Sequence, residues 1–419
     1  MLIETFIKND VYRDEMLTEE VVKEVIASQR DWIIQVEKGV ERDTLNKIEV
    51  RTGFAVIISG IRRCGKSILL SQILKKQSVF YYLNLEDPRL VGWELTDFNK
   101  AEKIFKAVYG AGGIYFFDEI QNIGQWEIFV RYLIDRKEKV VLTGSNASLL
   151  SRELGVKLTG RHRDVLLFPF SFREFLKFFK LEASQNSFEK FLFEGGFPEF
   201  LREKNPAVLN ELLNDVIMRD IVNRFGIRNS ALLKKLAIYL VSNVGKEFSF
   251  NSLKKMFPIK SVQTAIDYIS YFEDSYLLFT ISKFSYSYQE QQINPKKVYS
   301  IDNGFSNVNS VSFSKDKGRM LENSVFLHLR RKYSEIFYFR EEQECDFIIK
   351  EKNKISQVIQ VCFNLSAENR DREIKGLGAA MKKFKLEQGL ILTFGQEDLL
   401  EIEGKKITVQ PVWKYVLEK

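Results

Sequence analysis

The fold of this chain is decided by one continuous stretch, Phe54-Ala55-Val56-Ile57-Ile58-Ser59-Gly60-Ile61-Arg62-Arg63-Cys64-Gly65-Lys66-Ser67. Its first part, residues 54–59, is a short apolar run of the kind found in strands buried on both faces of a parallel sheet. Its second part, residues 60–67, matches the pattern G-x-x-x-x-G-K-[ST] and leads into a helical run at residues 68–74. We therefore expect a strand, a glycine-rich loop and a helix in that order.

The glycine-rich loop is suited to binding phosphate groups. Gly60 and Gly65 allow the backbone to wrap tightly with its N–H groups pointing inward, and the following helix presents the positive end of its dipole. Lys66 is expected to reach the β- and γ-phosphates of a nucleotide, and the Ser67 hydroxyl is expected to bind Mg²⁺. The expected nucleotide-binding residues of the loop are Gly60, Ile61, Arg62, Arg63, Cys64, Gly65, Lys66, Ser67 and Ile68.

A second apolar run, residues 114–117, ends in the adjacent carboxylates Asp118 and Glu119. This arrangement has the Walker B form. Because the chain turns at the end of a strand, both side chains can face one site. We expect Asp118 to hold the Mg²⁺ shell and Glu119 to polarise the attacking water.

Two further positions are candidates for catalysis alongside Lys66 and Glu119. Asn146 follows the apolar strand at residues 140–142, where a polar side chain would contact the γ-phosphate; an ordinary turn residue or helix N-cap explains it equally well. Arg161 precedes the last core strand, and it or Arg163 would neutralise charge in the transition state. A surface basic cluster is the equal alternative for these arginines.

Working outward, the chain divides into four parts. Apolar runs alternate with helical patterns, which indicates βαβ units and a doubly wound α/β fold over about residues 50–170. The first part, residues 1–170, holds a leader helix (Glu19 to Lys47) and this core, with strands expected at 54–59, 79–83, 114–117, 140–142 and 165–168; the second, residues 171–225, is expected to be a helical lid. The third part, residues 226–314, is expected to be a winged-helix module, with helices at 232–244, near 251 and at 261–272 and a wing from 277–287 and 297–300. The fourth part, residues 315–419, is expected to be an α/β domain, with a helix at 320–333 and strands at 337–339, 346–349, 358–361 and 390–393.

The composition fits a folded protein of several domains. Among 419 residues, 63 are basic and 56 are acidic; the net charge of +7 permits a polyanionic partner without establishing one. Three cysteines without C-x-x-C spacing and two histidines argue against a disulfide framework, a zinc site and a Ser-His-Asp triad. No export signal and no apolar run of about 18 residues is present, so we expect a cytoplasmic protein without membrane contact.

Taken together, the motifs resemble AAA-type P-loop ATPases of archaea and bacteria, related to the STAND class, that carry a C-terminal restriction-endonuclease-like domain of unresolved function. The resemblance is carried by Ser59–Ser67, Asp118–Gln121, Leu142–Ser145, Leu158–Arg161, Phe168–Phe175 and Gly195–Pro198. It implies an ASCE-type sheet, ATP as the nucleotide and Glu119 as the catalytic carboxylate. It also implies that Pro198 packs on adenine; without the resemblance, Pro198 is a helix-breaking turn residue.

The C-terminal domain departs from the nuclease pattern of that fold. Such nucleases need carboxylates that bind Mg²⁺ and a lysine that orients water. The resemblance places Glu322 and Asp346 at two of the acidic positions, but Gln360 and Cys362 stand where a Glu-x-Lys pair is required. We therefore expect a degenerate nuclease-like site at these four residues, in a domain that retains a binding surface.

Two functions of different classes follow. The first is a Mg²⁺-dependent ATPase that binds or remodels nucleic acid, DNA foremost; the second is a STAND-like nucleotide switch that controls assembly with protein partners. An ATP-driven nuclease is a third reading, which the residues at 360 and 362 disfavour. Basic residues beside aromatic ones favour the first reading, although winged helices also dock proteins and basic runs also form solvated faces. They are Lys254, Lys255, Lys260 and Lys283 with Phe257 and Phe284, and Lys382, Lys383 and Lys385 with Phe384, next to the run Arg370 to Lys375. A homo-oligomer would be required if an arginine acts on a neighbouring subunit.

Overall fold

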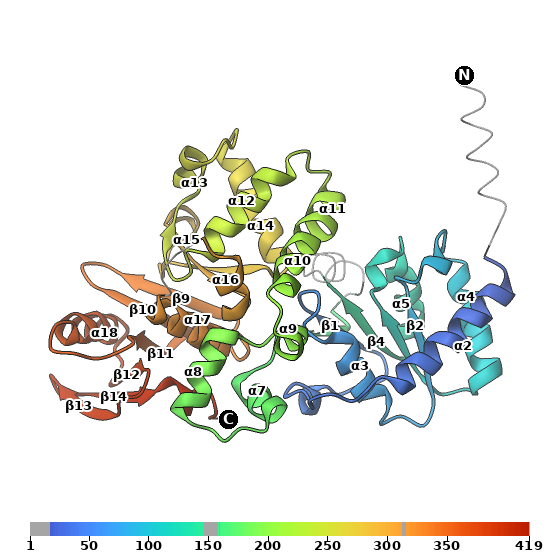
Figure 1. Cartoon of the computed structure of the whole chain (residues 1–419), viewed down its shortest axis with the longest axis horizontal. Coiled ribbons are helices and arrows are strands. Elements are labelled where there is room, and N and C mark those ends of the chain that lie inside the picture. Colours follow the sequence, from blue (N-terminus) through green and yellow to red (C-terminus); the bar gives the residue numbers. More distant parts are fainter. Residues whose placement is uncertain (1–16, 146–157, 159, 312–315, 419) are drawn as a thin grey trace. The chain divides into compact units, whose positions relative to one another are not determined.

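The computed structural model of the chain describes residues 17–145, 158, 160–311 and 316–418 (Figure 1). Its contacts divide the chain into two compact units, residues 1–60 with 65–167 and residues 61–64 with 168–419. Within the described ranges, no helix combines the length and apolar character that a membrane span needs.

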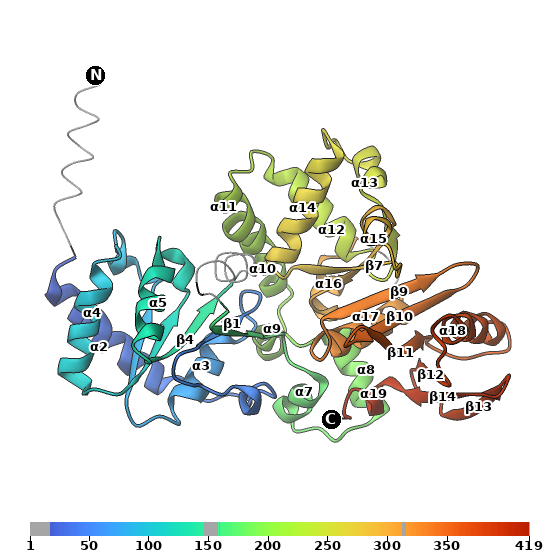
Figure 2. The ribbon, with the colours of Figure 1, turned by 180° about the vertical axis from the view of Figure 1, so that it is seen from behind.

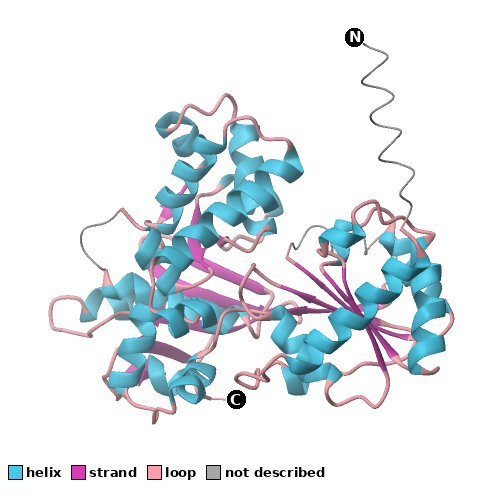
Figure 3. Ribbon diagram, turned by 45° about the vertical axis from the view of Figure 1, so that its right-hand side comes forward, coloured by secondary structure: helices cyan, strands magenta, loops and turns pink. Residues whose placement is uncertain are grey.

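The first unit is built on a five-stranded parallel sheet with the order β2-β3-β4-β1-β5. Figure 3 shows the strands of this sheet in magenta, with helices packed on them in cyan. The strands are β1 (Ala55–Ser59), β2 (Phe80–Asn84), β3 (Ile114–Asp118), β4 (Lys139–Gly144) and β5 (His162–Leu166). The predicted doubly wound α/β core is confirmed. β5 begins earlier than the predicted run at 165–168 because it is an edge strand, whose polar residues Arg163 and Asp164 are exposed and so break the apolar pattern.

Helices pack on this sheet through an apolar core. They are α2 (Glu19–Gln35), α3 (Lys66–Leu74), α4 (Asp97–Tyr109) and α5 (Trp126–Asp135), with 3-10 turns η1 (Leu45–Lys47), η2 (Pro88–Leu90) and η3 (Ile120–Asn122). Val22 and Ile26 of α2 pack in one cluster with Ile57 of β1 and Phe98 of α4. The predicted leader helix is shorter than expected, because α2 ends at Gln35 and the backbone turns through a left-handed Gly39.

The second unit begins with a run of helices, as expected for residues 171–225. These are α7 (Phe172–Phe179), α8 (Gln185–Glu194), α9 (Pro198–Glu203), α10 (Ala207–Asp215), the π-helical stretch η4 (Val216–Val222) and α11 (Asn223–Phe225). Serines define the first two helix starts, since Ser171 and Ser184 each form a capping box.

Three helices and a small antiparallel sheet of order β6-β8-β7 follow. The elements are α12 (Ser230–Val241), β6 (Glu247–Phe248), α13 (Phe250–Met256), α14 (Val262–Asp274), β7 (Leu278–Ser282), α15 (Tyr288–Ile293), β8 (Lys296–Ser300) and α16 (Asn303–Asn309). The expected helices and the two longer strands are present. The strand expected over residues 277–287 ends at Ser282, and the short β6 and α15 were missed because they hold too few residues to show a period.

The last part contains a mixed six-stranded sheet of order β13-β14-β12-β11-β10-β9. Its elements are α17 (Lys317–Arg330), β9 (Glu335–Arg340), β10 (Glu344–Glu351), β11 (Lys354–Val361), α18 (Arg370–Phe384), β12 (Gln388–Thr393), β13 (Asp398–Ile402), β14 (Lys405–Pro411) and α19 (Val412–Tyr415). α18 lies along β10 and β11 (Figure 2) and buries Leu377 and Met381 against the sheet. Phe326 of α17 stacks on Tyr299 of β8, 4.2 Å between ring centroids, and so connects the small sheet to this domain.

Candidate functional site

The side chain of Lys66 folds back onto the glycine-rich loop that precedes it. Gly65 adopts φ 102°, a left-handed conformation that favours glycine, and it directly precedes α3. Lys66, the first residue of α3, is 6% exposed, and its Nζ donates a hydrogen bond to the Gly60 carbonyl at 3.1 Å. The lysine ammonium therefore lies at the loop, where an anionic ligand held by the backbone N–H groups would meet it.

Ser67 and Asp118 meet at the same edge of the sheet. β1 and β3 are both parallel to β4, which lies between them, so their carboxyl ends converge. The Ser67 hydroxyl donates to Asp118 Oδ2 at 2.9 Å. Both are hard oxygen donors of the kind that Mg²⁺ prefers, so the donor set fits the expected metal.

Asp118 is almost fully buried, and its charge is costly there. Burial and the nearby charge of Glu119 raise the pKa of Asp118, whereas hydrogen bonds from Thr143 and Ser67 and the ammonium of Lys66 lower it. A divalent cation would favour the ionised carboxylate further, because its charge offsets the cost of burial.

Glu119 owes its direction to an unusual backbone conformation. At φ 51° and ψ 47° it is left-handed, and this turn brings two sequence neighbours to one site. Glu119 Oε1 lies 3.4 Å from Lys66 Nζ, and Glu119 Oε2 accepts a hydrogen bond from Gln121 Nε2 at 2.5 Å. The pairing of both carboxylates with the loop agrees with the geometry that the two motifs predict; their catalytic roles stay predictions.

Two polar residues that the sequence did not single out complete the site. Thr143, near the end of β4, donates its hydroxyl proton to Asp118 Oδ1 and accepts a hydrogen bond from the Glu119 N–H at 3.0 Å. Tyr82 of β2 donates to Asp118 Oδ2 at 3.1 Å. Thr143 had a readable signal, since it lies next to the last residue of β4, the strand between the two motif strands. Asn146, the residue expected to contact the γ-phosphate, lies outside the described residues.

A second polar cluster lies in the C-terminal part, around a buried lysine. Lys297 of β8 is 2% exposed, and its Nζ lies 2.9 Å from Asp346 Oδ1, 3.1 Å from Glu322 Oε1 and 2.6 Å from Glu344 Oε1. Tyr299 donates to the same Glu322 oxygen at 2.7 Å. Glu322 and Asp346 are thus brought together as expected, but an ammonium from another strand stands between them.

The protonation of this cluster follows from burial and charge. Burial lowers the pKa of Lys297, but the carboxylates of Asp346 and Glu322 outweigh it and raise that pKa well above its usual value. Burial also raises the pKa of Glu322 to about 7, against the lowering effect of Lys297. Within the described parts of the chain, no group of three or more histidine, cysteine or acidic side chains is arranged to hold a metal ion.

Gln360 belongs to this polar cluster and Cys362 does not. The Gln360 side-chain oxygen accepts from the Asp346 N–H at 3.2 Å, and its Nε2 donates to Glu373 Oε2 at 2.6 Å. Cys362 instead packs in the apolar core beneath α18, where burial raises the pKa of its thiol to about 12. The side chain of Cys362 is thus a core residue, and its part in a degenerate nuclease-like site stays a prediction.

Comparison with known proteins decides the family. A family model described as an AAA domain matches residues 52–176, and two models described as domains of unknown function, DUF8612 and DUF4143, match residues 185–314 and 317–415. The uncharacterized protein MJ1544 of Methanocaldococcus jannaschii is 35% identical, over 96% of this chain and 96% of its own. The chain belongs to the AAA-type P-loop ATPases.

Other similarities are weaker. An uncharacterized protein of Haemophilus influenzae is 29% identical over 77% of this ATPase and 86% of its own length. AMPPCP-bound DnaA from Aquifex aeolicus shares 16% identity with a TM-score of 0.27, covering 55% of this chain and 85% of DnaA. The STAND protein PH0952 of Pyrococcus horikoshii, which has a tetratricopeptide repeat sensor, shares 15% identity with a TM-score of 0.26. The match covers 71% of this chain and 47% of PH0952. Scores this low add nothing to the assignment.

Arg161 lies at the wrong edge of the ATPase sheet to act on a nucleotide in its own chain. β1 and β5 are parallel, with Ala55 opposite His162 and Ser59 opposite Leu166. Arg161 therefore sits at the amino end of β5, while the phosphate loop follows the carboxyl end of β1. Its Nη1 pairs with Asp135 at 2.6 Å on the surface. Only action on a neighbouring subunit remains as a prediction for Arg161.

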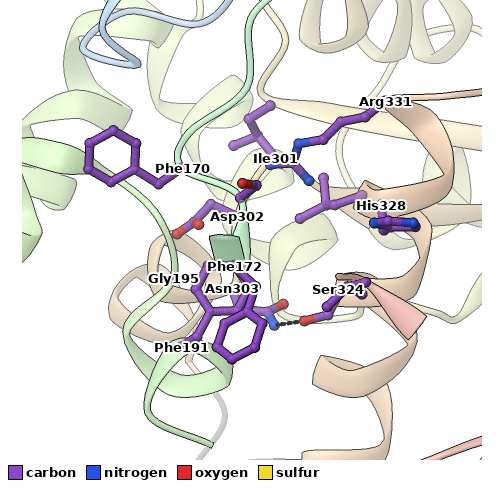
Figure 4. Close-up of a pocket in the computed structure, with 13 residues that line it drawn as sticks. Phe170, Phe172, Phe191, Gly195, Ile301, Asp302, Asn303, Ser324, His328 and Arg331 are labelled. Atoms are coloured by element: carbon purple, nitrogen blue, oxygen red, sulfur yellow. Dashed lines mark hydrogen bonds between the residues drawn. The ribbon is translucent and has the colours of Figure 1, made fainter. Parts of the chain in front are cut away.

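The Gly195–Pro198 element of the ATPase has a clear packing role. A Cβ on Gly195 would lie 2.1 Å from Asp302 Oδ1, and one on Gly196 would lie 2.3 Å from the Phe170 carbonyl oxygen. Asp302 accepts the Gly196 N–H at 2.6 Å, beside a small pocket (Figure 4), and burial raises its pKa to about 6. Pro198 is the first residue of α9. Its contact with adenine stays a prediction of the resemblance.

Proposed function

We propose that this AAA-type ATPase hydrolyses ATP to ADP and phosphate with Mg²⁺ as cofactor. The observation that carries the proposal is the 2.9 Å contact between Ser67 Oγ and Asp118 Oδ2, next to the 3.4 Å pair of Lys66 and Glu119. One hydroxyl and one carboxylate would hold Mg²⁺, which when bound neutralises phosphate charge.

Each residue of the site has a distinct task in this proposal. The loop backbone and Lys66 bind the phosphates and neutralise the charge that develops on them. Glu119 accepts a proton from the attacking water, and Gln121 fixes the direction of that carboxylate through its 2.5 Å hydrogen bond. Thr143 bonds to the Asp118 carboxylate and to the Glu119 backbone N–H, and so holds the turn that carries both acidic side chains.

ATP turnover is proposed to be coupled to nucleic acid, DNA foremost, through the second unit. Lys254 and Lys255 lie in the last turn of α13, and both are exposed. With the net charge of +7, they supply basic surface in the segment expected to be a winged helix. A metal-dependent nuclease is disfavoured, because Lys297 already neutralises the carboxylates that a metal would need.

Turnover assays test the proposal. ATP hydrolysis is measured for the wild type and K66A, with no polymer and with single-stranded, duplex and forked DNA, at two salt concentrations. Several-fold stimulation that fades with salt and is absent in K66A supports a nucleic-acid-coupled ATPase. Slow turnover that no polymer alters would support the nucleotide switch instead, and no turnover at all in the wild type would contradict the hydrolase.

A further inference from the structure

The second unit carries a groove beside the end of α18. One hollow of about 840 Å³ and a neighbouring one of about 380 Å³ share Phe284, Tyr286 and Lys383. We call the combined surface the β7–α18 groove; it is lined by residues from segments 283–294, 335–341, 350–355 and 383–386. It joins parts of the chain that two different family models match.

Backbone pairing fixes the floor of the β7–α18 groove. The segment after β7 runs beside β9, since the Phe284 N–H donates to the Tyr338 carbonyl at 2.7 Å. The Phe284 ring then meets Phe384 of α18 edge-on at 4.9 Å and Phe337 of β9 at 5.6 Å between centroids. The floor is therefore apolar and held by three separate elements.

Two tyrosines stand at the rim of this apolar floor. Tyr286 is 82% exposed and Tyr288 is 75% exposed, which is high for large aromatic side chains. The Tyr286 ring lies 5.2 Å from Phe284, so the aromatic surface continues from the floor to the rim. Such faces offer planar surfaces on which a flat ligand can stack.

The charge around the aromatic surface is positive. Six basic side chains and three carboxylates line the β7–α18 groove. Lys350 pairs with Glu335 at 2.7 Å and Lys383 with Glu341 at 2.8 Å. Among the residues that the structure describes, Lys354 and Lys385 have no carboxylate within ion-pair distance, and both are exposed.

We infer that the β7–α18 groove binds single-stranded nucleic acid, with lysines on the phosphates and Tyr286 and Tyr288 stacked on bases. A basic groove with exposed aromatic rings is the arrangement that binds single strands regardless of sequence. A nucleic-acid duplex matches this surface less well, because its base faces are stacked and cannot reach the tyrosines. A protein partner also matches it less well, because protein interfaces are depleted in lysine. The inference rests on the proposed function in one respect, namely that nucleic acid bound in the groove would alter ATP turnover. The binding itself requires no ATP.

The test is direct binding of a labelled oligothymidine of about 20 nucleotides to the full chain without nucleotide, measured by fluorescence anisotropy at several salt concentrations. The double variant Y286A/Y288A is expected to bind about tenfold or more weakly with an unchanged salt slope, and Y286F/Y288F to bind like the wild type. K354E/K385E is expected to weaken binding and to reduce the salt slope. K103E/K137E, which changes two exposed lysines of the first unit, is the matched control.

Three results would overturn the inference. The first is wild-type affinity in both groove variants. The second is a loss confined to K254E/K255E with preference for duplex, which would place binding in the predicted winged helix. The third is equally tight binding of an oligoglutamate whose affinity is the same for the wild type and for Y286A/Y288A, which would indicate an acidic protein partner. Because K66A should still bind the oligonucleotide, failure of the ATPase proposal is distinguishable from failure of the groove.

Discussion

Lys297 Nζ lies 2.9 Å from Asp346 Oδ1, although the two residues belong to segments that separate family models match. Glu322 and Glu344 complete the shell around the ammonium. A buried charge is tolerated only when opposite charges and hydrogen bonds surround it. This contact is therefore a structural link between the small sheet and the C-terminal domain, at the position where the nuclease resemblance places metal ligands.

Removing the ammonium is expected to destabilise the second unit. In K297M the carboxylates of Glu322 and Asp346 lose their counter-ion while still buried, which costs about 3–5 kcal/mol. Urea unfolding of the second unit measures the change. K296M is the control, because Lys296 is half-buried one residue earlier and donates to Ser282 at 2.8 Å. Equal stability of K297M and K296M would contradict the structural link.

The Glu322 carboxyl is expected to make stability depend on pH. Its pKa is raised from 4.5 to about 7 on folding, so its stabilising contribution is complete below about pH 4.5 and is lost as pH rises through 7. Between pH 5 and 8 the unfolding free energy of the wild type should fall relative to E322Q, by at most about 3 kcal/mol. Asp302, with a pKa of about 6, titrates in both the wild type and E322Q, so its contribution cancels when their unfolding free energies are compared. Parallel pH curves for the two would refute the assignment.

Thr143 is expected to matter for metal affinity. T143V loses the hydrogen bond that lowers the pKa of Asp118, so that carboxyl stays protonated to higher pH. ATP turnover should fall about tenfold, the acidic limb of the pH–rate profile should move up, and more Mg²⁺ should be needed for half-maximal rate. T143S keeps the hydroxyl and should retain most activity. An unchanged Mg²⁺ requirement in T143V would argue against the proposed role of Asp118.

Lys66 and Glu119 are expected to separate binding from chemistry. K66A should lose nucleotide binding, since the ammonium that meets the phosphates is gone. E119Q should keep or gain affinity, because the carboxylate 3.4 Å away no longer competes for Lys66, while hydrolysis falls about 100-fold or more. Titration with a fluorescent ATP analogue and phosphate release measure the two steps. Loss of binding to the same extent in both variants would remove the distinction.

The first unit was predictable because its signals are local. A buried parallel strand shows as an apolar run, and the glycine-rich loop is marked by residues within a few positions of one another. Arg161 shows what these local signals leave out. The sequence places it before the last core strand, but only the parallel register of β1 and β5 shows that it lies at the edge away from the loop.

The cluster around Lys297 could not have been predicted from sequence. The sequence predicts that Lys297 lies in a wing strand, and nothing within its own segment indicates that Glu322 and Asp346 will surround it. The contact depends on β8 packing beside α17 and β10, which is a tertiary property. The packing of Cys362 is equally hidden from the sequence, because this residue directly follows β11 and is buried in one core cluster with Leu377 and Met381 of α18.

The same cluster leads to an expectation about nuclease activity. The Lys297 ammonium lies 2.6–3.1 Å from three carboxylates and neutralises part of their negative charge. A divalent cation would therefore have to displace this buried lysine in order to bind. We therefore expect no nicking of supercoiled DNA by the wild type in Mg²⁺ or Mn²⁺, with or without ATP. Agarose electrophoresis measures this, with D346A as the control for a contaminating nuclease. Nicking by the wild type that D346A abolishes would restore the nuclease reading, and Lys297 would then be its water-orienting lysine.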